Sequence, residues 1–346
     1  MRGIAVVGST PLDDFLNDAS SSDRGELLQR VGLFGSLFGV TLVVGLLVFL
    51  AVVHRGSRAE VAVLLRAVAV AGGMTVLGAA VELAGVASIG GLSWSDALTD
   101  DTGAAPMVRL LGGLLVVLGL FDHTVPVDEH HDAHQDAHHD EHHDEHHEVL
   151  SDRPDDQPTL GPDGDVRWVP ASASAFGIVG AAVGVVSFWF DGHTVSRGPR
   201  VVHAVVDLVH VTAGGVWFGG LVGLCVVALL RRGSSVAPMV VRFSSVAAGA
   251  LVMATLAGSL MTLMVIDGFD DLTGTEWGRL LIVKVAAVGA TTLFGAYNHF
   301  VVVPALEAAR SARAMERRAV ATIGVEVALL ALVVAVTVFL TSASIN

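Results

Sequence analysis

Long apolar runs dominate the chain, and short polar segments separate them. Each run has about 18 or more residues with few charges, which is the length that a helix needs to cross a bilayer. Backbone inside lipid must satisfy its own hydrogen bonds, so each run is expected to be helical. The pattern predicts an all-α, polytopic transmembrane helical bundle with about eight spans. The predicted spans are 31–53, 63–88, 105–121, 171–190, 202–230, 243–266, 279–303 and 320–341.

Arginines gather in the short connections after the first, fifth and seventh runs. Connections rich in Lys and Arg face the cytoplasm, so these three are expected to be cytoplasmic. The acidic connections "SWSDALTDD" (93–101) and "DGFDDLTGTEW" (267–277) are then extracytoplasmic, as are both termini. Arg197 and Arg200, in an outside connection, oppose this orientation, but the sum of the charges favours it.

The longest connection divides the chain into unequal parts. Its five prolines and many acids are typical of a mobile linker. We predict an acidic extracytoplasmic tail at 1–30, a three-span membrane part at 31–121, a cytoplasmic loop at 122–170 and a five-span membrane domain at 171–346.

Composition supports a membrane protein and narrows its chemistry. Hydrophobic residues make up 53% and charged residues 16%, against about 25% charged in a soluble domain. The net charge of −14 sits mainly in the tail and connections, and no basic patch indicates a nucleic-acid partner. A single cysteine, Cys225, excludes a cysteine cage for a metal. No Walker A or "DKTGT" pattern occurs, so ATP-driven pumping is not expected and the chain is not predicted to be an enzyme.

The cytoplasmic loop contains "HHDAHQDAHHDEHHDEHHE" at 130–148, a repeat of four residues that is rich in histidine and acid. Side chains four apart lie on one face of a helix, where neighbouring imidazoles can share a metal ion. Imidazole suits copper, zinc and nickel, so the tract predicts a transition metal without selecting one. The alternative is a solvated, pH-sensitive charge run. The predicted ligands are His130, His131, His134, His138, His139, His142, His143, His146 and His147.

Ionisable residues inside predicted spans are costly and are candidates for function. The fifth span places His203, Asp207 and His210 on one helical stripe, with Trp217 further along it. Two histidines with a carboxylate between them can form part of a metal site near the outer end. Glycines at 214, 215, 219 and 220 would permit close helix packing.

Other spans add weaker candidates. Met261 and Met264 are soft ligands that suit Cu(I), although methionine also fills apolar cores. His299 lies near the inner end of the seventh span, as a ligand or as an interfacial hydrogen-bonding residue. Glu326 and Glu82 are each a proton site or a partner for Lys284 or Arg279. We expect Arg109 to reach the interface and His54 to be interfacial.

The residues from about 200 to 341 resemble the copper resistance protein D (CopD) family of copper-transport membrane proteins. The matching pieces are "HAVVDLVHVTAGGVWFGGL" (203–221), "RFSSVA" (242–247), "GTEWGRLLIVKVA" (274–286), "GAYNHFVVVPAL" (295–306) and "GVEVALLALVVAVT" (324–337).

The resemblance implies copper handling in the bacterial cytoplasmic membrane, with import as the usual direction. Its partners would be the bilayer, copper ions, an extracytoplasmic copper donor protein and a cytoplasmic copper chaperone. The 30-residue tail cannot be the copper-binding β-domain that many relatives carry, and the histidine tract is not part of the shared pattern. The family's motif positions fall on His203, Asp207, His210, Trp217, Arg279, Lys284, Asn298 and Glu326.

Copper import is therefore the leading interpretation, and three alternatives stay open. A zinc or nickel transporter fits the tract but not the methionines. A membrane haem protein needs two histidines at one depth on facing helices, which the expected topology does not provide. A metal sensor or storage protein needs fewer spans than this chain has.

Overall fold

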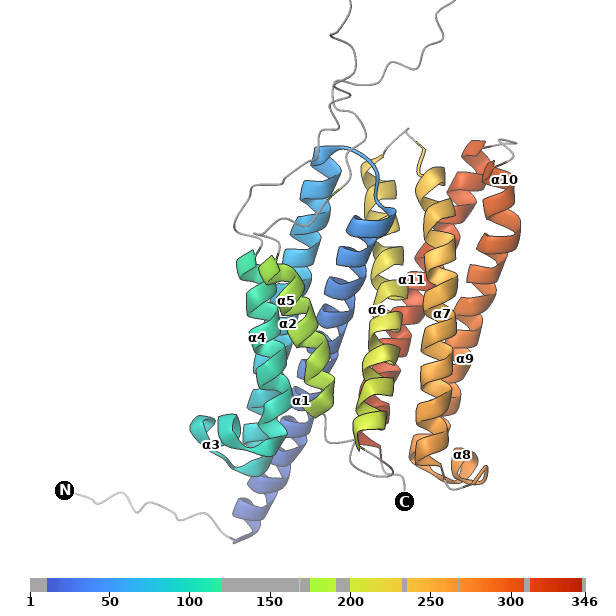
Figure 1. Cartoon of the computed structure of the whole chain (residues 1–346). Coiled ribbons are helices and arrows are strands. Elements are labelled where there is room, and N and C mark those ends of the chain that lie inside the picture. The colour runs from blue at the N-terminus through green and yellow to red at the C-terminus, as the bar shows by residue number, and fades with distance from the viewer. Residues whose placement is uncertain are drawn as a thin grey trace, which may run out of the picture.

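The computed structural model describes residues 11–119, 168, 175–190, 200–231, 235–266, 268–307 and 312–343, with side chains from Asp23 onward. These residues form a bundle of long helices that run side by side, and the described part contains no β-sheet (Figure 1). The predicted all-α polytopic bundle is confirmed.

The helices follow the apolar runs closely. Their bounds are α1 Pro11–Val48 with a π-helical turn Phe49–Val53, α2 Arg58–Gly90, α3 Trp94–Thr99, α4 Ala104–Gly119, α5 Ala175–Val186 with a 3₁₀ turn Ser187–Phe190, α6 Arg200–Leu230, α7 Ala237–Val265, α8 Asp271–Gly274, α9 Glu276–Tyr297 with a π-helical turn Asn298–Val302, α10 Val303–Glu307, and α11 Ala312–Ser342.

Seven helical stretches in the described residues are long and apolar enough to cross a membrane. They correspond to seven of the eight predicted spans. The eighth, predicted at 171–190, contains the shorter apolar helix Ala175–Phe190. The predicted tail at 1–30 also differs, since it is helical from Pro11 and continues into the first span.

Polar side chains mark where these helices begin and end. The Glu60 amide donates to the Ser57 hydroxyl at 3.3 Å, which caps the start of α2. Gly91 ends the same helix in the left-handed conformation with φ 59°, which glycine adopts without a steric penalty. The Gly278 amide donates to the Thr275 hydroxyl at 2.9 Å at the start of α9.

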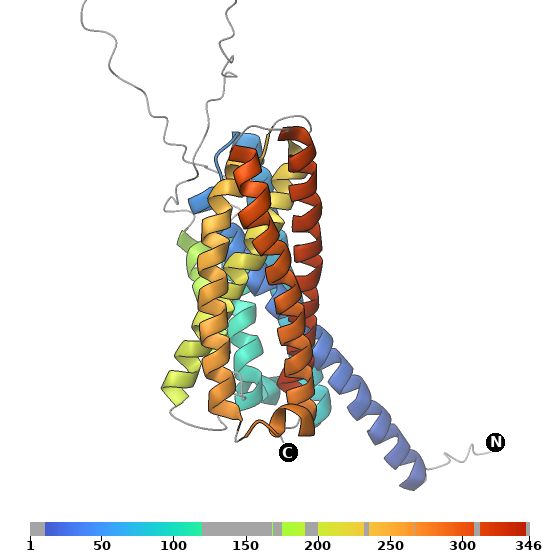
Figure 2. The ribbon, with the colours of Figure 1, turned by 90° about the vertical axis from the view of Figure 1, so that its right-hand side faces the viewer.

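The start of α1 and the end of α11 lie at the same end of the bundle (Figure 1). The N-terminal part of α1 projects away from the other helices (Figure 2). This arrangement agrees with the prediction that both termini share one side, while the side of the membrane stays a prediction. We call the end that holds the α1–α2 connection the inner end, and the opposite one the outer end.

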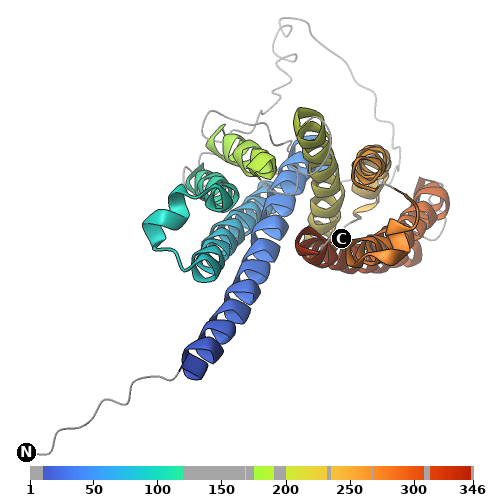
Figure 3. The same ribbon diagram turned by 90° about the horizontal axis from the view of Figure 1, so that it is seen from below.

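Two groups of helices meet at α1 and α6. Figure 3 shows α2, α4 and α5 on one side of α1, and α7, α9 and α11 beyond α6. The contact needs glycine, because a Cβ on Gly219 of α6 would lie 2.7 Å from the Cα of Gly45 on α1. Small residues at a crossing let two helix backbones approach closely. The predicted role of Gly219 in close packing is thereby confirmed.

The second group packs as two helix pairs. Helix α7 packs on α6, α9 packs on α11, and α6 also contacts α11. Trp217 is buried in the main apolar core together with Phe218 and Leu221, which follow it in the chain. Trp217 therefore contributes to the packing of this core.

Candidate functional site

The α6 stripe places three candidate residues in the outer half of the bundle. His203, Asp207 and His210 lie about 5, 10 and 15 Å along the axis from the start of α6. His203 is buried, whereas Asp207 and His210 are half-buried. The two imidazoles are therefore separated by about 10 Å along the helix, and Asp207 lies one turn from each.

His210 is held in one orientation by the neighbouring helix. Its Nδ1 lies 2.8 Å from the Ala254 carbonyl oxygen of α7. A carbonyl can only accept, so Nδ1 carries the proton and Nε2 keeps its lone pair. Gly258 of α7 makes room for the ring, because a Cβ there would lie 2.9 Å from Cε1 of His210. Metal-binding histidines show this pattern of one donating nitrogen and one free lone pair.

His203 presents a buried nitrogen without a described partner. Its side chain is 5% exposed. Nδ1 has no hydrogen-bond partner among the residues that the structure describes. Buried polar atoms are normally paired, so this nitrogen is a candidate position for a metal ion.

Lys284 of α9 faces the same region. It interacts electrostatically with Asp207 and with His210. Glu82 and Glu326 were each predicted to be a proton site or a partner for Lys284 or Arg279. Glu82 pairs with Arg109 at 2.8 Å, and the two alternatives for Glu326 stay open. Arg279 donates to the Thr273 carbonyl at 3.3 Å. A lysine near a carboxylate and an imidazole controls how strongly a cation is held there.

These side chains do not close into a cage. Within the described part of the chain, no group of three or more His, Cys, Asp or Glu residues is placed to hold one metal ion. His203, Asp207 and His210 therefore form successive positions along α6. Met261 and Met264 are half-buried near the outer end of α7. They stay predicted ligands.

A second polar group lies deeper in the bundle. The Asn298 side-chain amide donates to Glu326 Oε1 at 2.6 Å. The Thr322 hydroxyl donates to Asn298 Oδ1 at 2.6 Å. These contacts join α11 to the π-helical turn after α9. Asn298 and Glu326, two residues singled out from the sequence, are thus brought together.

His299, next along the same turn, points elsewhere. Its Nδ1 lies 2.7 Å from the Ser244 hydroxyl of α7, and its side chain is exposed. It is not part of the group around Glu326. Its role as an inner ligand stays a prediction.

The first group of helices contains a buried ion pair that sequence reasoning missed. Arg109 Nη1 of α4 lies 2.8 and 2.9 Å from the two Glu82 carboxylate oxygens of α2. Ser36 of α1 donates to the same carboxylate at 3.1 Å. We expected Arg109 to reach the interface, but it is 0% exposed. Arg109 stays inside the bundle because Glu82 supplies a counter-charge there.

His54 was also expected to be interfacial, yet it is 0% exposed. Its Nε2 lies 3.1 Å from Glu60 Oε2, and Arg231 Nε donates to Glu60 Oε1 at 2.6 Å. This network ties the α1–α2 connection to the end of α6. Burial lowers the pKa of the His54 imidazole below its ordinary 6.5, against the opposing effect of Glu60.

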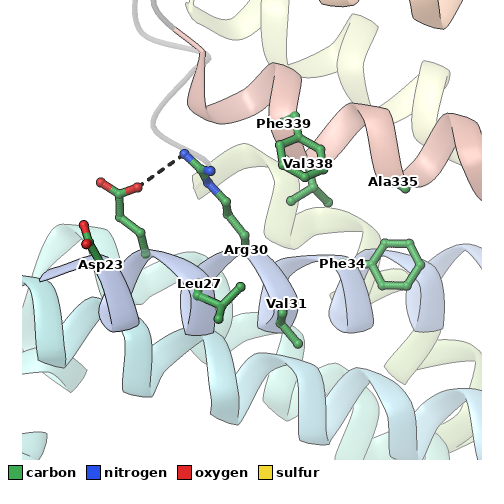
Figure 4. Close-up of a pocket in the computed structure, with 9 residues that line it drawn as sticks. Asp23, Leu27, Arg30, Val31, Phe34, Ala335, Val338 and Phe339 are labelled. Atoms are coloured by element: carbon green, nitrogen blue, oxygen red, sulfur yellow. Dashed lines mark ion pairs between the residues drawn. The ribbon is translucent and has the colours of Figure 1, made fainter. Parts of the chain in front are cut away.

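A pocket of about 390 Å³ lies between α1 and α11 at the outer end (Figure 4). Apolar side chains such as Phe34 and Phe339 line it, and Arg30 at its edge pairs with Glu26 at 3.4 Å. The pocket does not include the α6 stripe. The histidine tract from His130 to His147 lies outside the described residues.

Comparisons with known proteins place one region of the chain in a family. Residues 237–340 match the family model described as copper resistance protein D. No curated protein and no solved structure matches the chain. The match covers α7, α9 and α11 and begins after the α6 stripe. The resemblance seen in the sequence is therefore confirmed for this stretch, because residues 237–340 match the copper resistance protein D family.

Proposed function

We propose that this chain is a multi-pass protein that carries copper ions across the bacterial cytoplasmic membrane, in the inward direction. Family membership over residues 237–340 supports a role in copper resistance or transport. The arrangement of His210 is the observation that carries the proposal. An imidazole fixed by a backbone carbonyl, with Nε2 left free, is prepared to bind a soft or borderline metal ion.

The residues on α6 suggest a stepwise route. A copper ion would first meet His203 at the outer end and then Asp207 and His210, with Met261 and Met264 of α7 as further soft ligands. Lys284 supplies positive charge beside Asp207. That charge weakens the hold on a cation, which a transport site needs for release. His299 would receive the ion at the inner end.

The histidine tract at 130–147 extends the proposal beyond the bundle. It would bind or buffer copper in the cytoplasm after passage, and it would also accept zinc or nickel. An extracytoplasmic donor protein and a cytoplasmic chaperone are the partners that such a route implies.

Uptake by reconstituted protein tests this proposal. The full chain is placed in phosphatidylethanolamine and phosphatidylglycerol vesicles, and lumenal copper is measured with and without added zinc. The wild type should accumulate copper, and His210→Ala should lose most of that uptake. Thr262→Val is a matched control on α7, because within the described residues the Thr262 hydroxyl bonds to its own helix, at the Gly258 carbonyl. Equal uptake by wild type and His210→Ala would contradict the proposed route.

The alternatives give different outcomes in the same vesicles. A zinc or nickel transporter would accumulate those ions in preference to copper. A haem protein would purify with a Soret absorption band. A sensor or storage protein would bind copper without moving it into the lumen.

A further inference from the structure

Three carboxyl groups lie deep within described helices, and they differ in how their charge is balanced. Glu82 has Arg109 at 2.8 Å. Asp207 interacts with Lys284. Glu326 is 2% exposed, and no Lys, Arg or His side chain pairs with it in the part of the chain that the structure describes.

The neighbours of Glu326 that the described residues provide are Asn298, Cys225 and Gly295, and all three are uncharged side chains or glycine. Asn298, from the turn after α9, donates one hydrogen bond to Oε1. Cys225 of α6 is the titratable group that interacts with the carboxyl electrostatically. On α9, a Cβ at Gly295 would lie 3.5 Å from Oε2, so α9 places no side chain against that oxygen at this position.

A buried carboxylate without a counter-charge is costly in an apolar environment. The cation that neutralises Glu326 must therefore come from outside the bundle. Glu326 is about 24 Å along α11 from its outer end, near the middle of the helix. It is thus deeper in the bundle than the α6 stripe.

We propose that Glu326 is the proton-exchanging residue of copper transport, neutralised by a proton in the resting protein and by the passing copper ion during transport. This inference rests on the proposed transport function and names its coupling ion. When a copper ion reaches the carboxyl from outside, the O–H bond breaks and the proton leaves to the outer water. When the ion leaves inward, a proton from the inner water restores the acid. One proton then moves outward for each copper ion that moves inward.

The same vesicles with a pH-sensitive dye in the lumen test the exchange. Copper uptake by the wild type should raise the lumenal pH. A lumen one pH unit more acidic than the outside should raise copper accumulation about tenfold per proton exchanged. Glu326→Gln should show neither effect, and Glu326→Asp should keep both in weaker form. Thr337→Val, which removes a hydroxyl that donates to the Val333 carbonyl of the same helix, should behave as the wild type.

Two results overturn the proposal while leaving transport intact. One is copper accumulation by the wild type with no change in lumenal pH. The other is a Glu326→Gln variant whose dye signal equals that of the wild type. Failure of the transport function itself looks different, because the wild type would then take up no more copper than vesicles without protein.

Infrared difference spectra decide the protonation step independently of transport. The wild type at neutral pH should show a carboxylic-acid band that disappears when copper is added and is missing from Glu326→Gln. Circular dichroism confirms that the variant remains helical. A wild type without any band that depends on Glu326 would overturn the proposal.

Discussion

The Nδ1 atom of His210 lies 2.8 Å from the carbonyl oxygen of Ala254, so a backbone group of α7 sets the tautomer of a side chain on α6. The lone pair is thereby directed to Nε2. This relationship links the α6 stripe to α7, where the copper resistance protein D region begins. It also makes the position of the imidazole depend on how α6 and α7 pack.

A substitution that moves the ring without removing it should therefore impair transport. Gly258→Val places carbon atoms against the His210 imidazole, where even a Cβ would lie 2.9 Å from Cε1. We expect copper uptake to fall about 10- to 100-fold, as for other changes that misorient a metal-binding histidine. Gly249→Val is the control, because nothing lies within 4 Å of a Cβ at that position. Uptake by Gly258→Val at the level of the control would show that the ring orientation is unimportant.

The buried Glu82–Arg109 pair should stabilise the first group of helices. Arg109→Met leaves the Glu82 carboxylate uncompensated, and we expect a loss of about 3–5 kcal/mol in the free energy of unfolding. The double variant Glu82→Leu/Arg109→Met should lose less, because no charge remains buried. Thermal unfolding in detergent micelles measures both.

A surface ion pair provides the comparison for that measurement. Arg30 and Glu26 are 3.4 Å apart and largely exposed. Arg30→Met should change the free energy of unfolding by only about 0–1 kcal/mol. Similar losses in the free energy of unfolding for Arg30→Met and Arg109→Met would mean that the buried pair stabilises the fold no more than the surface pair does.

His54 should make the protein less stable in acid. Burial lowers the pKa of its imidazole from 6.5, so between the lowered value and about 6.5 the unfolded chain binds the proton and the folded chain does not. Its stabilising contribution is complete above about pH 6.5 and falls as the pH decreases towards the folded-state pKa. The unfolding temperature of wild type, relative to His54→Asn, should therefore fall on acidification. A rise in the unfolding temperature of the wild type relative to His54→Asn on acidification would contradict this prediction.

The crossing of α1 and α6 should tolerate almost no added volume. A methyl group on Gly219 would lie 2.7 Å from the Gly45 Cα, whereas one on Gly214 meets nothing within 4 Å. Gly219→Ala should lower the unfolding temperature, and Gly214→Ala should leave it unchanged or raise it, because alanine favours the helix. Equal unfolding temperatures would show that the crossing relaxes without cost.

Hydropathy predicted the helices well because a membrane span needs a long apolar run, whatever its neighbours are. The span predicted at 171–190 differs, since its described apolar helix Ala175–Phe190 is shorter than the seven helices that are long enough to cross a membrane. The stripe of His203, Asp207 and His210 also followed from the sequence, because the helical period alone places them on one face.

Partners across helices could not be predicted in the same way. Arg109 was expected at the interface because nothing in the local sequence indicates that Glu82, 27 residues earlier, supplies its counter-charge. His54 was misplaced partly for the same reason, because Arg231, which pairs with Glu60 beside His54, is 171 residues from Glu60 in the chain. The Ala254 carbonyl that orients His210 is 44 residues away. It is a backbone group, so no residue type in the sequence indicates its role.

Cellular copper content tests the central claim most directly. A host expresses the wild type, a His203→Ala/His210→Ala variant, or a chain that lacks residues 130–147, and protein levels in the membrane are matched. The wild type and the loop deletion should raise cellular copper, while the double variant should not. If only the deletion abolishes the gain, the copper was bound by the histidine tract and not transported, and the account of the α6 stripe as a copper route is contradicted.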